Sequence, residues 1–373
     1  MTVLFNNYGR RPVHLVKGQG TEVWDDTGKR YLDFTSGIAV LTLGHANPLL
    51  VKALQQQSEK LWHVSNLFAS PEQEKLGASL VKDTHLAHAL FCNSGAEANE
   101  AAIKLARKHS GKHHIITFEK SFHGRTYATM AATGQDKVKQ GFGPLVDKFT
   151  TIPFNDVAAL KQAADDTVGA IMLEVIQGEG GVNVATEEFI AAINEVSKEH
   201  GILVIVDEVQ TGIARTGKRY AFEYTALKPD IVSLAKGLGG GFPIGAILAK
   251  AEMYDTLGPG SHGTTFGGNP LAVAVAQTVI DTVFTETFLQ SVAELSAYAK
   301  QQITEKLSQF TVVGEGLLLG LVCPNGDAAA YVAKAEQQGL LVVQAGPGVI
   351  RLVPPLTVTK EEIDEAIAIL QTL

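Results

Sequence analysis

Two short apolar runs constrain this chain most, because each has the length of a buried strand and ends in a charged residue. Ile202–Val206 is followed by Asp207, and Ile231–Ala235 is followed by Lys236 and a cluster of glycines. Runs of this length and composition are typical of strands inside a sheet. In an open α/β sheet, ligands bind at the carboxyl ends of the strands. The sequence therefore predicts that a carboxylate and an amine meet at a ligand site.

A carboxylate and an amine at one sheet edge are the two groups that a pyridoxal phosphate site needs. The amine forms a Schiff base with the cofactor aldehyde, and the carboxylate keeps the pyridine nitrogen protonated, which makes the ring an electron sink. A single charge at a strand end is more often only solvated, so the pairing of Asp207 with Lys236 is what favours a functional site. Pyridoxal 5′-phosphate is the expected cofactor.

Predicted strands and helices alternate through the middle of the chain. This alternation predicts an α/β fold with a large, doubly wound, mostly parallel sheet and helices on both of its faces. The expected strands before Ile202 are Ala89–Cys92, His114–Phe118 and Ala170–Val175, and the expected helices are Ala96–His109, Val157–Ala164 and Glu187–Glu199.

The two ends of the chain have a different pattern. A hairpin is expected at Thr21–Asp25 and Lys29–Phe34, and a helical pattern begins near Pro48. The segment after Gly268 predicts helices from Pro270, near Phe288 and from Lys360, the last with a capping box at Thr359–Glu362, and strands Leu317–Cys323, Leu340–Gln344 and Ile350–Val353. We therefore expect a large domain over residues 48–268, and one small α/β domain built from residues 1–47 and 269–373.

Composition excludes several classes of protein. A net charge of −8, with no long Lys/Arg run, argues against a nucleic-acid partner. The two cysteines, Cys92 and Cys323, lie far apart and suit a reducing compartment. No apolar segment has the length of a signal-peptide core or a membrane span, so a cytoplasmic protein without a membrane partner is expected.

A third segment suits a phosphate group. The strand ending at Cys92 runs into Asn93-Ser94-Gly95-Ala96-Glu97 and then a helix. Ser94 is a good N-cap, Glu97 completes a capping box, and Gly95 allows the backbone to approach a ligand closely. Because helix N-termini present unpaired N–H groups and partial positive charge, this turn is a candidate phosphate site.

Together, the motifs DEVQTG (207–212), SLAKGLGGGFPIG (233–245) and NSGAEANEAAIKLAR (93–107) resemble the class III, ω-amino acid, aminotransferases. The resemblance covers essentially the whole chain. It implies the fold type I of pyridoxal phosphate-dependent transferases and a homodimer with shared active sites. It assigns catalytic roles to Lys236 and Asp207. The implied cofactor-binding residues are Ser94, Gly95, Ala96, Phe122, Asp207, Glu208, Val209, Gln210, Lys236 and, from the neighbouring subunit, Thr265.

The same resemblance implies how two different substrates are bound. Arg351 matches the site for the α-carboxylate of glutamate, and Arg125 matches the site for the distant carboxylate of an ornithine-like donor. Glu179 matches a carboxylate that pairs with the glutamate-binding Arg while the long donor is bound. The other implied substrate-binding residues are Thr264, Ile38 and Tyr8.

The expected reaction is transfer of an amino group from an ω-amine donor to 2-oxoglutarate. Ile38 stands where ornithine-specific members tend to carry Tyr, which leaves room for an N-acetyl group on the donor, whereas Tyr8 resembles a carboxylate contact of the ornithine enzymes. Other possible donors are ornithine, 4-aminobutyrate and succinyldiaminopimelate. The sequence also leaves open three other functions for the protein: a mutase, a decarboxylase, or a cofactor-binding regulator without turnover. No dehydrogenase glycine motif, zinc-hydrolase motif or Gly-x-Ser-x-Gly elbow is present, and no metal is expected.

Overall fold

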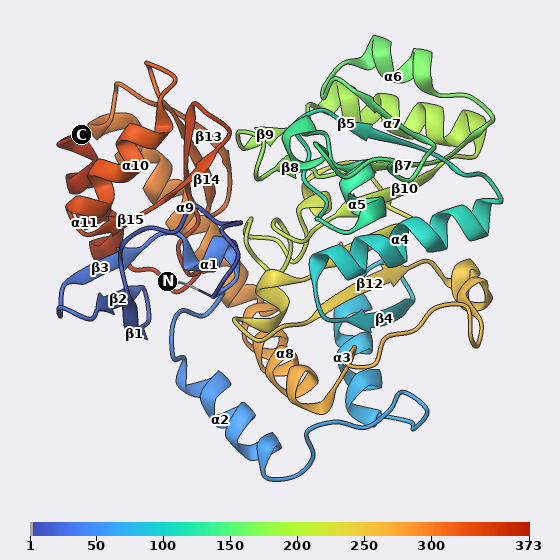
Figure 1. Ribbon diagram of the computed structural model, residues 1–373, viewed down its shortest axis with the longest axis horizontal. Helices are drawn as coiled ribbons and strands as arrows, with labels where there is room; N and C mark the ends of the chain where they lie inside the picture. The colour runs from blue at the N-terminus through green and yellow to red at the C-terminus, as the bar shows by residue number, and fades with distance from the viewer. Residues whose placement is uncertain (1–2) are drawn as a thin grey trace.

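A seven-stranded sheet forms the centre of the protein in a computed structural model that describes residues 3–373 (Figure 1). The strand order is β4-β12-β11-β10-β7-β5-β6, and only β12 runs against its neighbours. Six carboxyl ends therefore share one edge. The strands are β4 (His88–Cys92), β5 (His114–Phe118), β6 (Phe149–Ile152), β7 (Val168–Leu173), β10 (Leu203–Asp207), β11 (Ile231–Leu234) and β12 (Gly245–Ala249).

Helices cover both faces of this sheet, because successive strand residues point to opposite sides. Ile205 packs with the alanines of α4, whereas Val206 packs in the cluster that contains Phe189 of α7 and Leu76 of α3. The helices around the sheet are α2 (Pro48–Ser58), α3 (Pro71–Val81), α4 (Gly95–Ser110), α5 (Tyr127–Ala132), α6 (Val157–Ala163), α7 (Glu187–His200) and α8 (Pro270–Val283).

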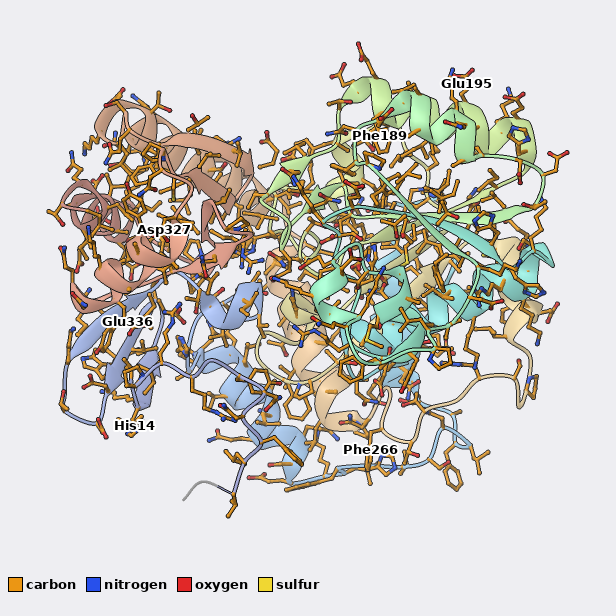
Figure 2. All side chains as sticks on the ribbon, turned by 45° about the horizontal axis from the view of Figure 1, so that its top comes forward. His14, Phe189, Glu195, Phe266, Asp327 and Glu336 are labelled. Carbon is orange, nitrogen blue, oxygen red and sulfur yellow. The ribbon has the colours of Figure 1, made fainter. Side chains whose placement is uncertain are left out.

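The two ends of the chain lie side by side (Figure 1), and in Figure 2 His14 lies on the same side of the molecule as Asp327 and Glu336. Strand β15 pairs in parallel with β3, so that Leu340 is opposite Leu32. The elements here are β1 (Leu15–Gln19), β2 (Glu22–Asp25), β3 (Arg30–Asp33), α1 (Ser36–Ala39), α9 (Glu286–Lys306), β13 (Thr311–Glu315), β14 (Leu318–Val322), α10 (Ala328–Gln337), β15 (Leu340–Leu341), β16 (Val343–Ala345), β17 (Val349–Leu352) and α11 (Lys360–Gln371).

The predicted alternation, the hairpin and the last helix with its capping box are confirmed. The structure adds elements that the sequence did not predict, among them α3, β6 and the antiparallel strand β12. Within residues 3–373, no single helix is long and apolar enough to cross a membrane. The one pair that passes by length and composition together, α8 with α9, bends by 72° where the two helices meet.

Candidate active site

Asp207 and Lys236 meet at the carboxyl edge of the large sheet, as predicted. Asp207 ends β10 and lies opposite Ser233 of β11, and Lys236 follows β11 at the start of a 3-10 turn. Both residues line a cavity of about 440 Å³. Of the other predicted site residues, Ser94, Gly95, Ala96, Phe122, Arg125, Val209 and Gln210 also line it. The cavity therefore lies at the ends of four strands, β4, β7, β10 and β11, and at the start of α4.

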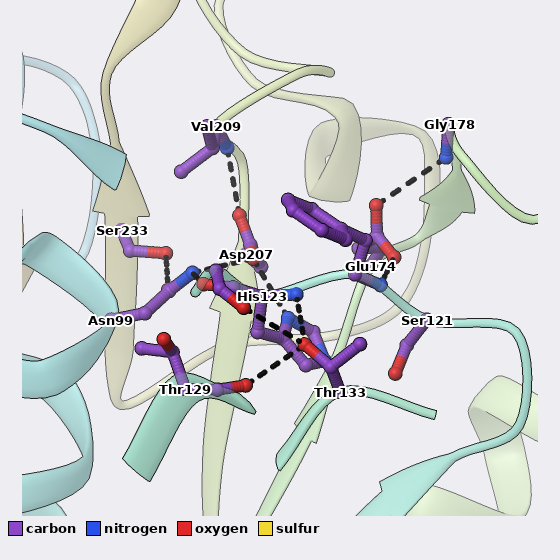
Figure 3. Close-up of polar contacts among 12 residues, drawn as sticks. Asn99, Ser121, His123, Thr129, Thr133, Glu174, Gly178, Asp207, Val209 and Ser233 are labelled. Carbon is purple, nitrogen blue, oxygen red and sulfur yellow. Dashed lines mark hydrogen bonds and ion pairs between the residues drawn. The ribbon is translucent and has the colours of Figure 1, made fainter. Parts of the chain in front are cut away.

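A buried hydrogen-bond network fixes the Asp207 carboxylate (Figure 3). Its Oδ2 accepts from Asn99 Nδ2 and lies 2.8 Å from His123 Nδ1, and its Oδ1 accepts from the Val209 N–H at 3.0 Å. Ser233 donates in turn to Asn99 Oδ1 at 2.6 Å. Asn99 and His123 were not predicted. Asn99 lies on the buried face of α4, and an amide within that alanine-rich stripe was a signal that could have been used.

The Lys236 amine lies in an environment that favours its uncharged form. Burial lowers its pKa below the ordinary value, and the positive charge of Arg351 acts in the same direction. Glu179, Asp207 and Glu174 oppose this shift without reversing it. Because only an uncharged amine is a nucleophile or a base, Lys236 is suited to both tasks.

The start of α4 forms the opposite wall of the cavity. Ser94 Oγ accepts from the Glu97 N–H at 3.1 Å, as the predicted cap requires. The second half of the predicted capping box differs, because Glu97 Oε2 accepts from the N–H of Asn93 rather than that of Ser94. A Cβ atom on Gly95 would lie 2.8 Å from Val209 Cγ1, so only glycine lets these two walls approach. Ser94, Gly95 and Ala96 of this turn line the cavity, and the first N–H groups of a helix have no partner within the helix.

Arg351 reaches this region from β17, far away in the sequence. Its side chain is only 1 % exposed, and Nη1 donates to Glu179 Oε1, Gln210 Oε1 and the Gly178 carbonyl, each at 2.8 Å. Burial alone would raise the pKa of Glu179, but the charges of Arg351 and Lys236 hold it below its ordinary value. Arg351 Nε is buried without a partner among residues 3–373. Arg351 and Glu179, which were both predicted to act in substrate binding, therefore form an ion pair with each other.

Arg125 lies on another side of the cavity and is exposed. Its guanidinium carbon is 5.5 Å from the centre of the Phe122 ring, a cation–π contact. The segment that follows Arg125 is held by Glu100 of α4. Its Oε1 accepts from the Thr126 hydroxyl and from the N–H groups of Ala128 and Thr129. Among residues 3–373, Arg125 thus forms no ion pair with a carboxylate, unlike Arg351.

Several predicted site residues lie outside this cavity. Glu208 points away from it and accepts from the Thr211 hydroxyl and the Phe222 N–H. Thr264 Oγ1 accepts from Asn93 at 3.1 Å, while Thr265 is exposed. Ile38 and Tyr8 are also exposed, and Ile38 belongs to a turn, α1, whose residues have left-handed backbone angles. A single chain therefore brings the predicted residues at the sheet edge together in one cavity, whereas Glu208, Thr264, Thr265, Ile38 and Tyr8 lie outside that cavity.

Glu174 is a cavity residue that the sequence analysis missed. It follows strand β7, which ends at Leu173, whereas the predicted strand continued to Val175 and therefore placed Glu174 inside the strand rather than at its end. Burial raises the pKa of Glu174 to about 7, against the opposing charge of His123. Its two carboxylate oxygens accept from the N–H groups of Phe122 and Gly178.

Comparison with known proteins gives this arrangement a family. The class-III aminotransferase family matches residues 5–373, and the chain belongs to that family. It is 51 % identical to an acetylornithine aminotransferase of Bacillus subtilis over 372 residues, which cover 99 % of this chain and 96 % of the relative.

Solved structures agree with this assignment. An N-acetylornithine aminotransferase of Stenotrophomonas maltophilia has a TM-score of 0.85 and 40 % identity, covering 98 % of this chain and 96 % of that one. An ornithine aminotransferase of Toxoplasma gondii, whose structure has PLP at the active site, has a TM-score of 0.93 and 33 % identity, covering 99 % and 91 %. The fold is therefore that of the pyridoxal phosphate aminotransferases, and pyridoxal 5′-phosphate is the cofactor.

The described residues fit this cofactor. Lys236 supplies an amine of lowered pKa, and Asp207 supplies a fixed carboxylate on the neighbouring strand. The N-terminus of α4 supplies N–H groups where a phosphate group would be stabilised. His123 Nε2 is a buried polar atom without a partner among residues 3–373, so the cavity wall has hydrogen-bonding capacity beyond what the chain itself uses.

Proposed function

We propose that this protein is an acetylornithine aminotransferase, which transfers the δ-amino group of N2-acetylornithine to 2-oxoglutarate and yields N-acetylglutamate 5-semialdehyde and glutamate, a step of arginine biosynthesis. The observation that carries the proposal is the pairing of Arg351 with Glu179 next to Gln210, which lines the cavity, while Arg125 lines the cavity without an ion-pair partner among residues 3–373. Two arginines, one of which is neutralised, suit an enzyme that must bind two unlike substrates in turn.

Pyridoxal phosphate, when bound, supplies the electron sink that stabilises negative charge on the substrate carbon. Lys236 moves a proton at that carbon, which its lowered pKa favours. Asp207, held by Asn99 and His123, would keep the ring nitrogen protonated. Phe122 and Val209 line the cavity, where their apolar side chains would hold the ring and exclude water from the reacting atoms. Ser94, Gly95 and Ala96 bind the phosphate.

The Arg351–Glu179 pair acts as the substrate switch in this proposal. When N2-acetylornithine is bound, Glu179 neutralises Arg351, and Arg125 binds the distant carboxylate. When glutamate or 2-oxoglutarate binds, its α-carboxylate takes the place of Glu179 on Arg351, and the unpartnered Nε offers a further donor. A switch of this kind changes the charge available to the substrate without moving Arg351, which is anchored by Gly178 and Gln210.

The donor decides between this proposal and its main alternative, ornithine. The acetyl group removes one positive charge from the donor, and Ile38 is apolar where the ornithine enzymes tend to carry Tyr. A single-turnover experiment that follows the absorption band of the bound cofactor should show faster reaction with N2-acetylornithine than with ornithine, 4-aminobutyrate or succinyldiaminopimelate. Faster reaction with ornithine would replace the proposal, and absence of any reaction would favour a non-catalytic regulator.

We also infer a homodimer with shared active sites. Leu61, Trp62, Leu67, Phe68 and Phe266 form an exposed apolar surface, the loop patch, and Leu67 is 91 % exposed. Asn66 donates to the carbonyls of Thr264 and Gly267, so the patch includes the loop that carries Thr265; Phe266 is labelled at the edge of the molecule in Figure 2. An apolar surface of this kind favours association. Thr265 then reaches the partner's phosphate site.

Mixing two inactive chains tests the shared site. Lys236→Ala lacks the amine, and Thr265→Glu places a negative charge where the partner's phosphate would bind. In a heterodimer, one site combines Lys236 of the second chain with Thr265 of the first and is intact. Activity should reappear on refolding the two together, whereas no recovery in a dimer that forms normally would exclude the sharing of Thr265.

Two further assignments accompany this function. We place the protein in the cytoplasm, which its free, buried cysteines Cys92 and Cys323 support. We also retain the division into a large domain, 48–268, and a small domain, 1–47 with 269–373. The pairing of β3 with β15 supports a small domain built from both ends, although α8, beyond the boundary, packs against α2 and α3.

A further inference from the structure

Glu174 holds two separate segments of the active site with one buried carboxylate (Figure 3). Its Oε2 accepts from the Phe122 N–H at 3.1 Å and its Oε1 accepts from the Gly178 N–H at 3.3 Å. The side chain is buried and lines the cavity. His123, Asp207 and Lys236 are the charged or titratable groups whose charges act on it, and none of them is hydrogen-bonded to it.

The Gly178 peptide connects Glu174 to Arg351. Its N–H donates to Glu174, and its carbonyl accepts from Arg351 Nη1 at 2.8 Å. A Cβ atom on Gly178 would lie 2.3 Å from the Gln210 side chain, so the peptide is also pressed against the cavity wall. The next residue is Glu179, the partner of Arg351. Three contacts thus fix the backbone from which Glu179 extends.

We propose that Glu174 is a positioning residue for the glutamate half of the reaction, because it fixes the Gly178 peptide that orients Arg351 and carries Glu179. This inference rests on the proposed function. Glutamate must displace Glu179 from Arg351, and a fixed Gly178 backbone lets the Glu179 side chain rotate away while Arg351 stays in place. N2-acetylornithine reacts with the Arg351–Glu179 pair intact, so it depends less on Glu174.

Glu174→Gln tests this role because it replaces one acceptor oxygen by an amide NH2 group. Two N–H donors then compete for one oxygen, and the shorter contact, to Phe122, should persist while the longer one, to Gly178, is lost. The single-turnover rate with glutamate should fall about tenfold more than the rate with N2-acetylornithine, the loss typical of one hydrogen bond to a charged group. Glu174→Asp, whose shorter side chain cannot span both donors, should produce a split in the same direction.

Glu208→Gln is the matched control. Glu208 is equally buried, burial also raises its pKa to about 7, and it accepts a backbone N–H from Phe222, but it lies outside the cavity. Its substitution should leave the ratio of the two half-reaction rates within about twofold of wild type, since ordinary losses of stability act on both half-reactions alike.

A double-mutant comparison of Glu174 with Glu179 provides a second test. If Glu174 acts through Gly178 and Glu179, then Glu174→Gln should change the rate ratio about tenfold in the wild type, but less than about twofold in a Glu179→Ala background. Equal slowing of both half-reactions, the same split in Glu208→Gln, or additive effects with Glu179→Ala would each overturn the inference. Failure of the wild type to react with N2-acetylornithine would instead overturn the proposed function, and the two failures are therefore distinguishable.

Discussion

The floor and the rim of the active-site cavity are built in different ways. The floor, made of Asp207, Lys236 and their neighbours, lies at the carboxyl edge of one sheet, and the Asp207 carboxylate is hydrogen-bonded to buried partners. The rim contains Arg125, which is exposed. From this difference we infer that the buried residues at the strand ends determine the reaction, whereas exposed residues at the rim determine which substrate binds. Four predictions test this comparison, from the largest expected effect to the smallest.

Loss of the floor amine should have the largest effect. Lys236→Ala removes both the group that holds the cofactor and the group that moves the proton, so turnover should fall by at least about 10⁴-fold. The visible absorption band of the bound cofactor should shift as well. Steady-state assay and absorption spectra check both. Normal turnover of a well-folded variant would exclude Lys236 from the chemistry.

Loss of Arg351 should affect one substrate only, because in the proposed switch Glu179 neutralises Arg351 while N2-acetylornithine is bound. Arg351→Ala should raise the KM for 2-oxoglutarate about 100-fold, which corresponds to the upper range for a charged hydrogen bond. It also leaves Glu179 without its partner. The KM for N2-acetylornithine serves as the internal control. Equal increases for both substrates would show that Arg351 supports the site as a whole.

Loss of Arg125, the arginine at the rim, should have a smaller effect, and this effect should concern the other substrate, N2-acetylornithine. Arg125→Ala should raise the KM for N2-acetylornithine about tenfold, since an exposed arginine gains less from its partner than a buried one. The single-turnover rate at saturating donor should stay close to wild type. A change confined to glutamate would contradict the assignment of the two arginines.

A buried glutamate behind the floor should affect stability rather than substrate choice. Burial raises the pKa of Glu208 from 4.5 to about 7, so its stabilising contribution is complete below pH 4.5 and is lost as the pH rises through about 7. Glu208→Gln lacks this dependence. The variant should therefore gain stability relative to wild type by roughly 1–3 kcal/mol between pH 5 and pH 8. Denaturant unfolding at both pH values measures it, and a constant difference would show that Glu208 does not titrate.

The sequence predicted those parts of the fold that have a clear local pattern of apolar residues. Continuous apolar runs predicted β10 and β11, because a strand buried on both faces must be apolar throughout. Strand β12 was missed although Gly245–Ala249 is equally apolar. It follows a glycine-rich loop that was interpreted as part of the motif around Lys236, and nothing in its local sequence indicates that it returns antiparallel between β11 and β4.

The site shows where motif reasoning ends. Asp207 and Glu208 are neighbours in one motif, yet side-chain alternation sends only Asp207 into the cavity, and this alternation could have separated them. Glu174 was missed because the predicted strand extended to Val175, two residues beyond the observed end of β7 at Leu173, and so included Glu174. The contacts of Arg351 with Gly178 and Gln210 could not be derived from the sequence, because they depend on how the segment after residue 269 folds back on the sheet.

The pairing of β3 with β15 has a consequence for how the polypeptide is made. Leu32 leaves the ribosome early, but its partner Leu340 is translated near the end of synthesis. The central sheet can form while translation continues, whereas the pairing of β3 with β15 has to wait for the last segment of the chain. Arg351, which we propose binds glutamate, belongs to that final segment, so a nascent chain acquires Lys236 well before it acquires this proposed substrate contact.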